Sequence, residues 1–270
     1  MKSIRERYGG WALVAGAAEG IGEAFTLSLA EQGFNLILVD RNQSAMHVLA
    51  EKVAGKHRVE SIELHLDLAA ADAAGLCLEA AKSRDCRLLV YVAAKSRISR
   101  FLSLTTTELD AFLSVNTWTM LHVVNGFSNH LKSEGEPGGI ILMSSLAGLI
   151  GPKYAATYAA TKSFAIRLAE ALHDELKADG IDILACCAGT VSTPTYRDSH
   201  PDFSRIRPVF TDAEDVATYA LKKLGKTARC IPGWRNRLLY FLLMRVAPWS
   251  LASRLVNGAM DKMYGSAFRP

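Results

Sequence analysis

Short apolar runs alternate along the chain with longer segments whose apolar residues recur at helical spacing. The runs predict buried strands at Trp11–Ala15, Asn35–Val39, Ser61–Leu66, Leu88–Val92, Gly139–Met143 and Ile181–Cys187. The longer segments predict amphipathic helices at Gly20–Gln32, Ser44–Ala54, Asp72–Ser83, Thr106–Lys132 and Tyr154–Ala178. Such alternation predicts an α/β fold, a doubly wound parallel sheet with helices on both faces. Ligands bind such sheets at the carboxyl ends of the strands.

Composition narrows the class of protein. No proline-, glycine- or serine-rich linker divides the 270 residues, so we expect one domain over residues 1–270. The net charge is +4 and no basic stripe with interleaved aromatic residues is present, which argues against nucleic acid as a partner. The five cysteines form no regular framework, which favours reduced thiols in a cytoplasmic protein. The N-terminus lacks a signal-peptide pattern and no apolar run reaches about 18 residues, so neither secretion nor membrane spanning is expected.

A glycine-rich turn, G16-A-A-E-G20-I-G22, separates the first predicted strand from the first predicted helix. Glycine permits a tight turn and close approach of the backbone to a pyrophosphate, and the helix N-terminus offers free N–H groups there. Asp40 ends the second strand 18 residues after Gly22. That spacing is close to the roughly 20 residues at which an acid hydrogen-bonds the adenosine ribose. Together these features predict a Rossmann-like dinucleotide site.

The spacing Y-x-x-x-K occurs three times, at Tyr91/Lys95, Tyr158/Lys162 and Tyr219/Lys223. The first pair starts in a predicted strand, where residues four apart lie about 13 Å from each other. The last pair falls on a helix predicted after Thr211, but it has no hydroxyl residue at the matching upstream position. The middle pair shares a helical face, and Ser145 ends the apolar segment before it. Only this copy brings a phenol, an ammonium and a hydroxyl together.

In this order the motifs resemble those of the short-chain dehydrogenase/reductase family, along nearly the whole chain. A15-G-A-A-E-G-I-G22 is similar to the family's first glycine motif, with Ala15 in place of a threonine. The resemblance implies that Asn116, Ser145, Tyr158 and Lys162 are catalytic, with Asn116 associated with the proton-relay water. It implies that Asp67 contacts the adenine and Thr193 the nicotinamide carboxamide. The cofactor-binding residues expected are Gly16, Gly20, Ile21, Gly22, Asp40, Arg41, Asp67, Leu68, Ala93, Tyr158, Lys162, Val191 and Thr193.

One segment departs from the family pattern. The motif N-N-A-G after the fourth strand is replaced here by Y91-V-A-A94. In the family this segment stabilises the central sheet and lines the cofactor. We therefore expect the change to affect cofactor affinity or local backbone geometry more than the catalytic chemistry.

Hydride transfer to a carbonyl develops an alkoxide on the substrate oxygen, which needs a proton donor and a second hydrogen bond. Tyr158 is expected to donate the proton, or to act as the base in oxidation, and Ser145 to hold the oxygen. A nearby ammonium favours a phenolate, so Lys162 is expected to lower the pKa of Tyr158 and also to bond the nicotinamide ribose. No metal site is predicted, because H-E-x-x-H is absent and His122 and His130 are expected on a helix surface.

The cofactor expected is NAD, with NADP as the alternative. Asp40 would accept hydrogen bonds from free ribose hydroxyls and repel a 2′-phosphate. Glu19 occupies a position in the glycine turn where relatives that use NADP often carry a basic residue. Arg41 follows Asp40, however, and would pair with a phosphate if Asp40 turned away.

The last third of the chain carries the information on substrate. Residues 194–210 match the family's substrate lid in position, and residues 232–270 are expected to form a C-terminal helical extension. Within it, residues 234–249 combine aromatic and aliphatic residues with three arginines. This pattern fits an interfacial helix or the mouth of a site for steroids, retinoids or fatty acyl groups. It also fits a subunit contact or a helix packed on the core, which we favour, so membrane-surface contact is possible but not favoured.

The sequence thus predicts an NAD(P)-dependent oxidoreductase that moves a hydride between the cofactor and a small-molecule secondary alcohol or ketone. The alternative enzyme is an NADPH-dependent carbonyl or 3-oxoacyl reductase. The alternative outside enzymes is a non-catalytic dinucleotide-binding regulator or scaffold, for which the altered Y91-V-A-A94 segment is the only support. Resembling enzymes pair through the two long helices, so we expect a homodimer or homotetramer, with Phe164 and Leu168 giving the later helix an apolar stripe.

Overall fold

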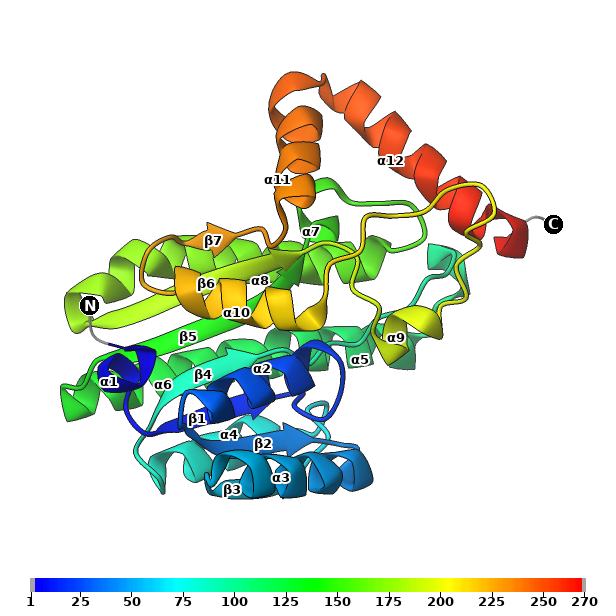
Figure 1. Ribbon diagram of the computed structural model, residues 1–270. Helices are drawn as coiled ribbons and strands as arrows, with labels where there is room; N and C mark the ends of the chain where they lie inside the picture. The colour runs from blue at the N-terminus through cyan, green and yellow to red at the C-terminus, as the bar shows by residue number, and fades with distance from the viewer. Residues whose placement is uncertain (1–2, 269–270) are drawn as a thin grey trace.

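One parallel seven-stranded sheet forms the centre of the computed structural model, which describes residues 3–268 (Figure 1). The strands are β1 (Trp11–Ala15), β2 (Asn35–Asp40), β3 (Ser61–His65), β4 (Cys86–Tyr91), β5 (Gly138–Ser145), β6 (Ile181–Ala188) and β7 (Arg229–Cys230). They lie in the order β3-β2-β1-β4-β5-β6-β7, and every neighbouring pair is parallel. The predicted doubly wound α/β fold is confirmed.

Helices connect the strands and extend the chain at both ends. The α-helices are α1 (Ile4–Tyr8), α2 (Ile21–Glu31), α3 (Gln43–His57), α4 (Ala73–Lys82), α5 (Thr106–Leu113), α6 (Thr119–Glu134), α7 (Ala147–Ile150), α8 (Ala156–Glu175), α9 (Pro194–Arg197), α10 (Ala213–Lys223), α11 (Trp234–Phe241) and α12 (Trp249–Tyr264). Short 3₁₀ turns are η1 (Phe101–Ser103), η3 (Leu176–Asp179) and η5 (Gly265–Phe268), and π turns are η2 (Ser114–Trp118) and η4 (Leu242–Val246).

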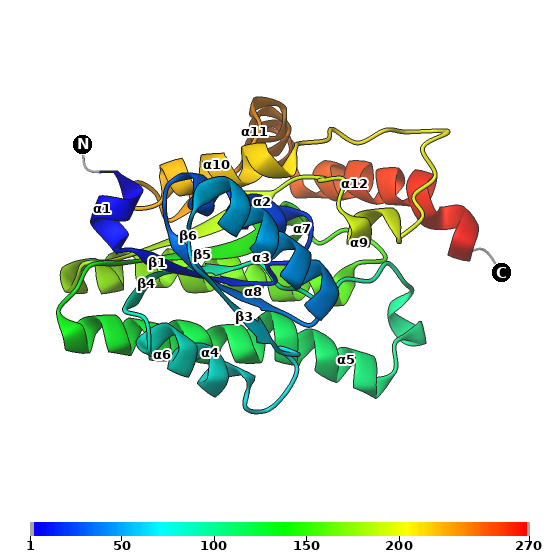
Figure 2. The same ribbon diagram turned by 60° about the horizontal axis from the view of Figure 1, so that its bottom comes forward.

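Two helical layers cover the sheet, as the views in Figures 1 and 2 show from different sides. The layer of α2, α3 and α10 packs on one face through residues such as Phe25 and Val216. The layer of α4, α6 and α8 packs on the other through residues such as Phe127. Because side chains alternate along a strand, neighbouring Leu13 and Val14 of β1 belong to opposite cores. Burial on both faces explains why the strands are continuous apolar runs.

The structure corrects four details of the predicted elements. A seventh strand, β7, was not predicted, because its two residues are too few to form an apolar run. The strand β3 was expected to be buried, and this is wrong because it lies at the sheet edge and is only partly covered. Helix α8 begins at Ala156 rather than Tyr154, whose φ of 66° is left-handed. The helix predicted at Thr106–Lys132 is interrupted by the π turn η2.

The C-terminal segment leaves the sheet after β7 and forms a helical hairpin, residues 234–264, made of α11, the π turn η4 and α12 (Figure 1). The hairpin stands out from the body of the fold at the top of the view and returns along α12. Within residues 3–268, no helix combines the length and the apolar character that crossing a bilayer requires.

Candidate active site

A cavity of about 880 Å³ lies at the carboxyl ends of the strands. The order of the sheet puts it there, because β1 has β2 on one side and β4 on the other, and connections leave in opposite directions at this point. Residues that end or follow separate strands therefore meet in its wall, among them Gly16, Asp40, Val92, Ser145 and Ala188.

Most of the predicted site residues line this single cavity. Those in its wall are Gly16, Ile21, Asp40, Arg41, Asp67, Leu68, Ala93, Ser145, Tyr158, Lys162, Val191 and Thr193. Gly20, Gly22 and Asn116 are not part of the wall. Most of the separately predicted catalytic and cofactor-binding residues thus lie in the wall of one cavity, and Gly20, Gly22 and Asn116 lie outside that wall.

The glycines of the turn are required by close contacts. Gly16 has a φ of +82°, and a Cβ there would lie 2.6 Å from the backbone nitrogen of Ala93. A Cβ on Gly22 would lie 1.7 Å from the carbonyl oxygen of Gly16. Gly20 has a φ of +57°, and a Cβ there would lie 2.7 Å from the methyl group of Thr193. The turn is therefore compact and leads directly into α2, whose N-terminus has the positive end of the helix dipole, which fits a pyrophosphate.

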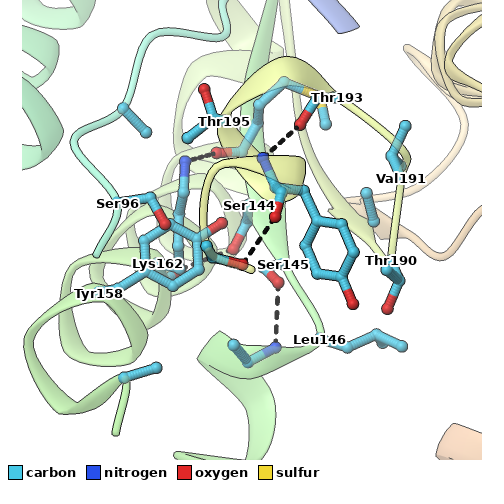
Figure 3. Close-up of a pocket in the computed structure, with 18 of the residues that line it drawn as sticks. Ser96, Ser144, Ser145, Leu146, Tyr158, Lys162, Thr190, Val191, Thr193 and Thr195 are labelled. Atoms are coloured by element: carbon cyan, nitrogen blue, oxygen red, sulfur yellow. Dashed lines mark hydrogen bonds between the residues drawn. The ribbon is translucent and has the colours of Figure 1, made fainter. Parts of the chain in front are cut away.

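Ser145, Tyr158 and Lys162 lie together on one side of the cavity, with the loop of Thr190, Val191 and Thr193 on the other (Figure 3). Ser145 is the last residue of β5, and its hydroxyl oxygen accepts a hydrogen bond from the nitrogen of Ala147 at 3.1 Å. Tyr158 and Lys162 occupy the first two turns of α8. The ammonium nitrogen of Lys162 lies 5.7 Å from the centre of the Tyr158 ring.

The pKa of Tyr158 is raised rather than lowered, which corrects the prediction from sequence. Burial is the main cause, and a hydrogen bond with Ser145 opposes it. Lys162 does not contribute the expected lowering, and its ammonium donates to the carbonyl oxygen of Met143 at 2.8 Å. Burial also lowers the pKa of Lys162 to about 8. In this state the phenol is a proton donor at neutral pH, and the ammonium loses its charge as the pH rises through about 8.

Asn116 lies behind the cavity wall, in the π turn η2, and is buried. Its side-chain oxygen accepts from the nitrogen of Lys95 at 2.7 Å, and its amide donates to the carbonyl oxygen of Lys95 at 3.0 Å. The amide also donates to the hydroxyl of Thr161 on α8 at 2.9 Å. Asn116 therefore joins the segment after β4, which lines the cavity at Lys95 and Ser96, to the helix of Tyr158 and Lys162.

Sequence reasoning missed the contact that Tyr91 makes. Its buried hydroxyl donates to the carbonyl oxygen of Val115 at 2.8 Å, next to Asn116 in the π turn. The nitrogens of Val92 and Ala93 both donate to the carbonyl oxygen of Ala15 at 2.8 Å. The altered Y91-V-A-A94 segment thus stays joined to β1, and its tyrosine supports the turn that carries Asn116.

At the opposite end of the cavity the carboxylate of Asp40 is held by backbone. Its two oxygens accept from the nitrogens of Ala18 and Asn42, each at 2.9 Å. The amide of Asn42 donates to the carboxylate of Glu19 at 3.0 Å, so two acidic side chains flank this end. Arg41 is exposed, and its guanidinium forms no ion pair with any residue from 3 to 268.

Much of the remaining wall is apolar, and a large part of it comes from the last third of the chain. The hairpin contributes residues such as Leu243, Met244 and Met260, and the segment 194–210 contributes Tyr196 and Val209. Sequence reasoning placed both segments near the substrate but could not say which residues point inward. The cavity therefore has a polar half beside the sheet and an apolar half beneath the hairpin.

The described residues hold no group of three or more histidine, cysteine or acidic side chains that would suit a metal ion. His122 packs beside Trp118 on the same helix, with ring centres 4.2 Å apart. What the cavity does offer is a glycine turn, an acid at the end of β2 and a serine, tyrosine and lysine on one wall. That combination defines a dinucleotide-binding oxidoreductase.

The family described as short chain dehydrogenase matches residues 10–203. The chain belongs to this family, as the motifs predicted. A 7beta-hydroxysteroid dehydrogenase from Clostridium sardiniense is 30% identical over 235 residues, which cover 87% of this chain and 90% of that protein. A very-long-chain 3-oxoacyl-CoA reductase-like protein from Arabidopsis thaliana is 30% identical over 248 residues, covering 88% of this chain and 77% of that protein.

Solved structures show the same fold. The structure of a 7beta-hydroxysteroid dehydrogenase superposes with a TM-score of 0.85 at 26% identity and covers 94% of this chain and 99% of that chain. A short-chain dehydrogenase from Sphingobium yanoikuyae in complex with NADPH has a TM-score of 0.74 at 21% identity, over 82% of this chain and 86% of that chain. The first similarity extends into the C-terminal part of the chain.

Proposed function

We propose that the protein moves a hydride between a nicotinamide cofactor and a secondary alcohol or ketone bound against Ser145 and Tyr158. One observation carries the proposal: these two residues and Lys162 line the same cavity that continues past the glycine turn to Asp40. A non-catalytic scaffold does not need a tyrosine, a serine and a lysine together on one wall of the cavity. The altered Y91-V-A-A94 segment does not favour such a scaffold, because it remains part of the sheet.

The chain's own residues handle the proton and the substrate oxygen. When bound, the nicotinamide supplies or accepts the hydride. The phenol of Tyr158 donates a proton to the oxygen on which negative charge develops, and the hydroxyl of Ser145 donates a second hydrogen bond to it. The raised pKa of Tyr158 keeps the phenol protonated, which suits reduction. In oxidation the same phenol must act as a base, and a charged Lys162 then helps by favouring the phenolate.

The apolar half of the cavity supports a bulky lipophilic substrate. Leu243, Met244 and Met260 offer aliphatic and thioether groups, and thioether side chains adapt to irregular ligand shapes. Two relatives are named for a hydroxysteroid and for a 3-oxoacyl-CoA. We favour an alicyclic hydroxy or keto compound such as a steroid, with a fatty 3-oxoacyl compound as the second candidate.

A screen of substrates and cofactors tests the proposed function. Hydroxysteroids, ketosteroids, 3-oxoacyl compounds and small ketones are each mixed with NAD(H) or NADP(H) while nicotinamide absorbance is followed. We expect turnover that rises with the lipophilic size of the substrate until the substrate fills the apolar half of the cavity. Bound cofactor with no turnover of any alcohol or ketone would contradict the proposal.

For the cofactor we propose NAD, with NADP as the alternative. The carboxylates of Asp40 and Glu19 flank the end of the cavity where the adenosine ribose would lie. Two acids at that place favour free hydroxyls over a 2′-phosphate. The unpaired Arg41 supports the alternative, because guanidinium groups bind phosphate well.

Asp40→Asn should lower the affinity for NAD about tenfold and raise the affinity for NADP, since the amide keeps one acceptor oxygen and removes the repulsive charge. Titration of both cofactors by protein fluorescence measures the change. Asp67→Asn is the control, because Asp67 lines the cavity on the proposed adenine side, so this change should weaken both cofactors alike. An unchanged ratio in Asp40→Asn, or a wild type that prefers NADP tenfold, would show that Arg41 decides.

Tyr91→Phe should lower kcat about three- to tenfold with little change in KM, because the π turn that carries Asn116 loses a buried hydrogen bond worth about 1 kcal/mol. Tyr8→Phe is the matched control. That hydroxyl is equally buried and donates to Asp182 at 2.7 Å, but it lies at the amino ends of the strands. The control should lose stability and keep kcat. If both variants have the same kcat, the hydroxyl of Tyr91 does not help to position the site.

Two further features complete the proposal. Residues 194–210 act as a substrate lid, supported by Tyr196, Ile206 and Val209 in the cavity wall. Residues 232–270 act as the helical extension that closes the cavity, with residues 269–270 outside the described part of the chain. A homodimer or homotetramer forms through α5, η2, α6 and α8, where Trp118, Leu121 and Phe164 are exposed. Leu168 instead packs partly on the core, so the apolar stripe expected on α8 reaches the surface only at Phe164.

A cytoplasmic setting is proposed from the cysteines. All five are free and buried. Burial raises the pKa of the thiols of Cys77, Cys86 and Cys187 to about 12. Protonated, enclosed thiols are structural rather than reactive, and they need no oxidising compartment.

A further inference from the structure

The tip of the hairpin, residues 241–255, displays large apolar side chains to the surroundings. Phe241, Leu242, Val246, Trp249, Leu251 and Leu255 are each between 44% and 62% exposed. Of these six, only Leu255 also lines the cavity. Several large apolar side chains exposed within one short segment mark a candidate site of association, because water-soluble proteins seldom expose large apolar patches.

The charged side chains of the same region are all basic. Residues 216–260 contain no aspartate or glutamate, while Arg245 and Arg254 lie within the tip itself. Both arginines are exposed, and neither forms an ion pair with any of the residues from 3 to 268. Apolar side chains flanked by unpaired arginines are the pattern of an element that rests in an anionic lipid surface.

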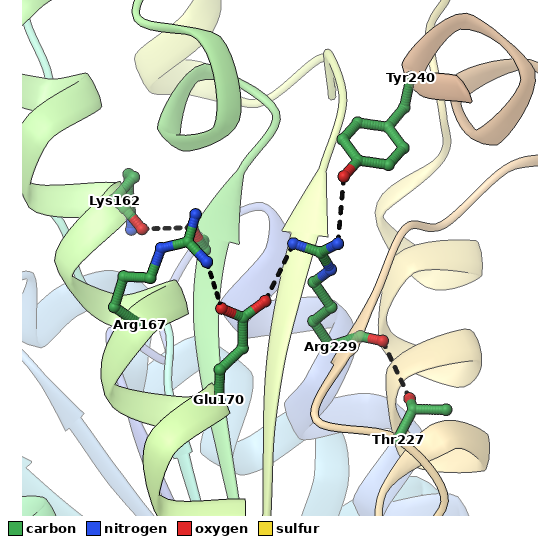
Figure 4. Close-up of polar contacts among 7 residues, drawn as sticks. Lys162, Arg167, Glu170, Thr227, Arg229 and Tyr240 are labelled. Atoms are coloured by element: carbon green, nitrogen blue, oxygen red, sulfur yellow. Dashed lines mark hydrogen bonds and ion pairs between the residues drawn. The ribbon is translucent and has the colours of Figure 1, made fainter. Parts of the chain in front are cut away.

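Polar contacts hold the two ends of the hairpin and leave its tip projecting. Near the start, the hydroxyl of Tyr240 accepts a hydrogen bond from Arg229 at 3.1 Å, and Arg229 pairs with Glu170 on α8 at 2.9 Å (Figure 4). Near the end, Asp261 pairs with Lys153 at 2.8 Å and accepts from the hydroxyl of Tyr154 at 2.7 Å. The tip therefore extends away from the sheet on a fixed base (Figure 1).

A second copy of the chain fits this surface less well. In a two-fold symmetric contact the same patch meets itself, so the arginines of one tip would face those of the other. No carboxylate between residues 216 and 260 is available to balance them. An anionic bilayer supplies the opposite charge and an apolar layer together.

We propose that the hairpin tip docks the protein on anionic membrane surfaces, with Phe241, Val246 and Trp249 inserted and Arg245 and Arg254 at the headgroups. The docked element lies in the interface and does not cross it, since α11 and α12 are 8 and 16 residues long. The opposite side of the hairpin covers the apolar half of the cavity. If the proposed function holds, a lipophilic alcohol or ketone would reach the site from the membrane through this cover.

Flotation with vesicles tests the docking. Purified full-length protein without cofactor is mixed with vesicles of phosphatidylcholine alone or with one third phosphatidylglycerol, and the floated fraction is measured at low and high salt. We expect binding to the anionic vesicles only, weakened by salt because charge attraction is screened. Protein that stays with the soluble fraction under all these conditions overturns the proposal.

Paired variants separate the apolar and charged contributions. Phe241→Ser with Trp249→Ser, and separately Arg245→Glu with Arg254→Glu, should each lower vesicle binding at least tenfold. The controls, Val48→Ser with Leu102→Ser and Lys56→Glu with Lys82→Glu, change exposed residues elsewhere and should bind like wild type. All four should keep the wild-type melting temperature and affinity for NADH in vesicle-free buffer. Equal losses in variants and controls would overturn the proposal.

The readouts distinguish this proposal from the proposed function. A protein that turns over a ketone but never floats contradicts the membrane proposal alone. A protein that floats through its tip but turns over no alcohol or ketone contradicts the proposed function alone. If Phe241→Ser with Trp249→Ser instead lowers the oligomeric state of a protein that does not float, the tip binds a second copy and the membrane proposal is wrong.

Discussion

Replacing Tyr158 with phenylalanine should lower turnover at least about a hundredfold while the affinity for cofactor stays within about twofold of wild type. The ring remains to fill its place in the wall, so only the proton donor is lost. Measured as kcat and as cofactor Kd on the same preparation, the two numbers separate chemistry from binding. Lys162→Ala should differ by losing both, since that ammonium is assigned to the phenol and to the ribose.

The chain provides its own control for this prediction. Lys223 lies 5.5 Å from the ring centre of Tyr219, nearly the separation of Lys162 and Tyr158. The Tyr219 pair is on α10 and outside the cavity. Tyr219→Phe should therefore leave kcat unchanged. If Tyr158→Phe retains near-normal turnover, or Tyr219→Phe loses as much, the assignment of the proton donor is wrong.

Gly22→Ala should abolish most cofactor binding and destabilise the fold by about 2 kcal/mol or more. The added methyl carbon would lie 1.7 Å from the carbonyl oxygen of Gly16. Both atoms are attached directly to the backbone of the turn, so no side-chain rotation relieves the clash. The turn must open to accept it, which spoils the backbone arrangement offered to a pyrophosphate. Thermal melting and cofactor titration measure the two effects.

Gly55→Ala is the matched control. Gly55 lies within α3, and a Cβ there meets nothing within 4 Å. Alanine is the better helix former by about 1 kcal/mol, so this variant should be as stable as wild type or more stable, with normal cofactor affinity. A Gly22→Ala protein that melts and binds cofactor like Gly55→Ala would show that the turn is looser than its contacts indicate.

The sheet was largely readable from the sequence because its strands are covered on both faces. Burial on both sides makes a strand such as β1 apolar at nearly every position, and this pattern survives without knowledge of the tertiary contacts. The pattern disappears where burial does. Strand β7 has two residues and is recognisable only by its pairing with Ala185 and Cys186 of β6.

The placement of the candidate catalytic residues was predictable where spacing along one element fixes geometry, as it does for Tyr158 and Lys162 on α8. What surrounds that wall depends on contacts distant in sequence. The hydroxyl of Tyr91 meets a carbonyl 24 residues away, and the amide of Asn116 meets a hydroxyl 45 residues away. No periodicity along the chain encodes either contact.

The direction of the pKa shift at Tyr158 also could not be predicted without the structure. A lysine four residues after a tyrosine suggests a lowered phenol pKa, but the direction depends on how deeply both groups are buried and on what the ammonium already contacts. Here burial raises the pKa of Tyr158, and the ammonium of Lys162 is engaged by Met143. In the hairpin, likewise, apolar residues on all sides of α11 did not reveal which of them face the cavity.

Transfer of deuterium from the reduced cofactor tests directly whether a hydride moves to the substrate at this site. Reduced cofactor carrying deuterium at the transferring position of the nicotinamide is incubated with the best ketone from the screen, and the product alcohol is examined by mass spectrometry. We expect the product alcohol to carry one deuterium on the carbinol carbon. Wild type should form this product, and Tyr158→Phe should form it at least about a hundredfold more slowly. Product without label, or labelled product formed equally fast by both proteins, would contradict hydride transfer at this wall.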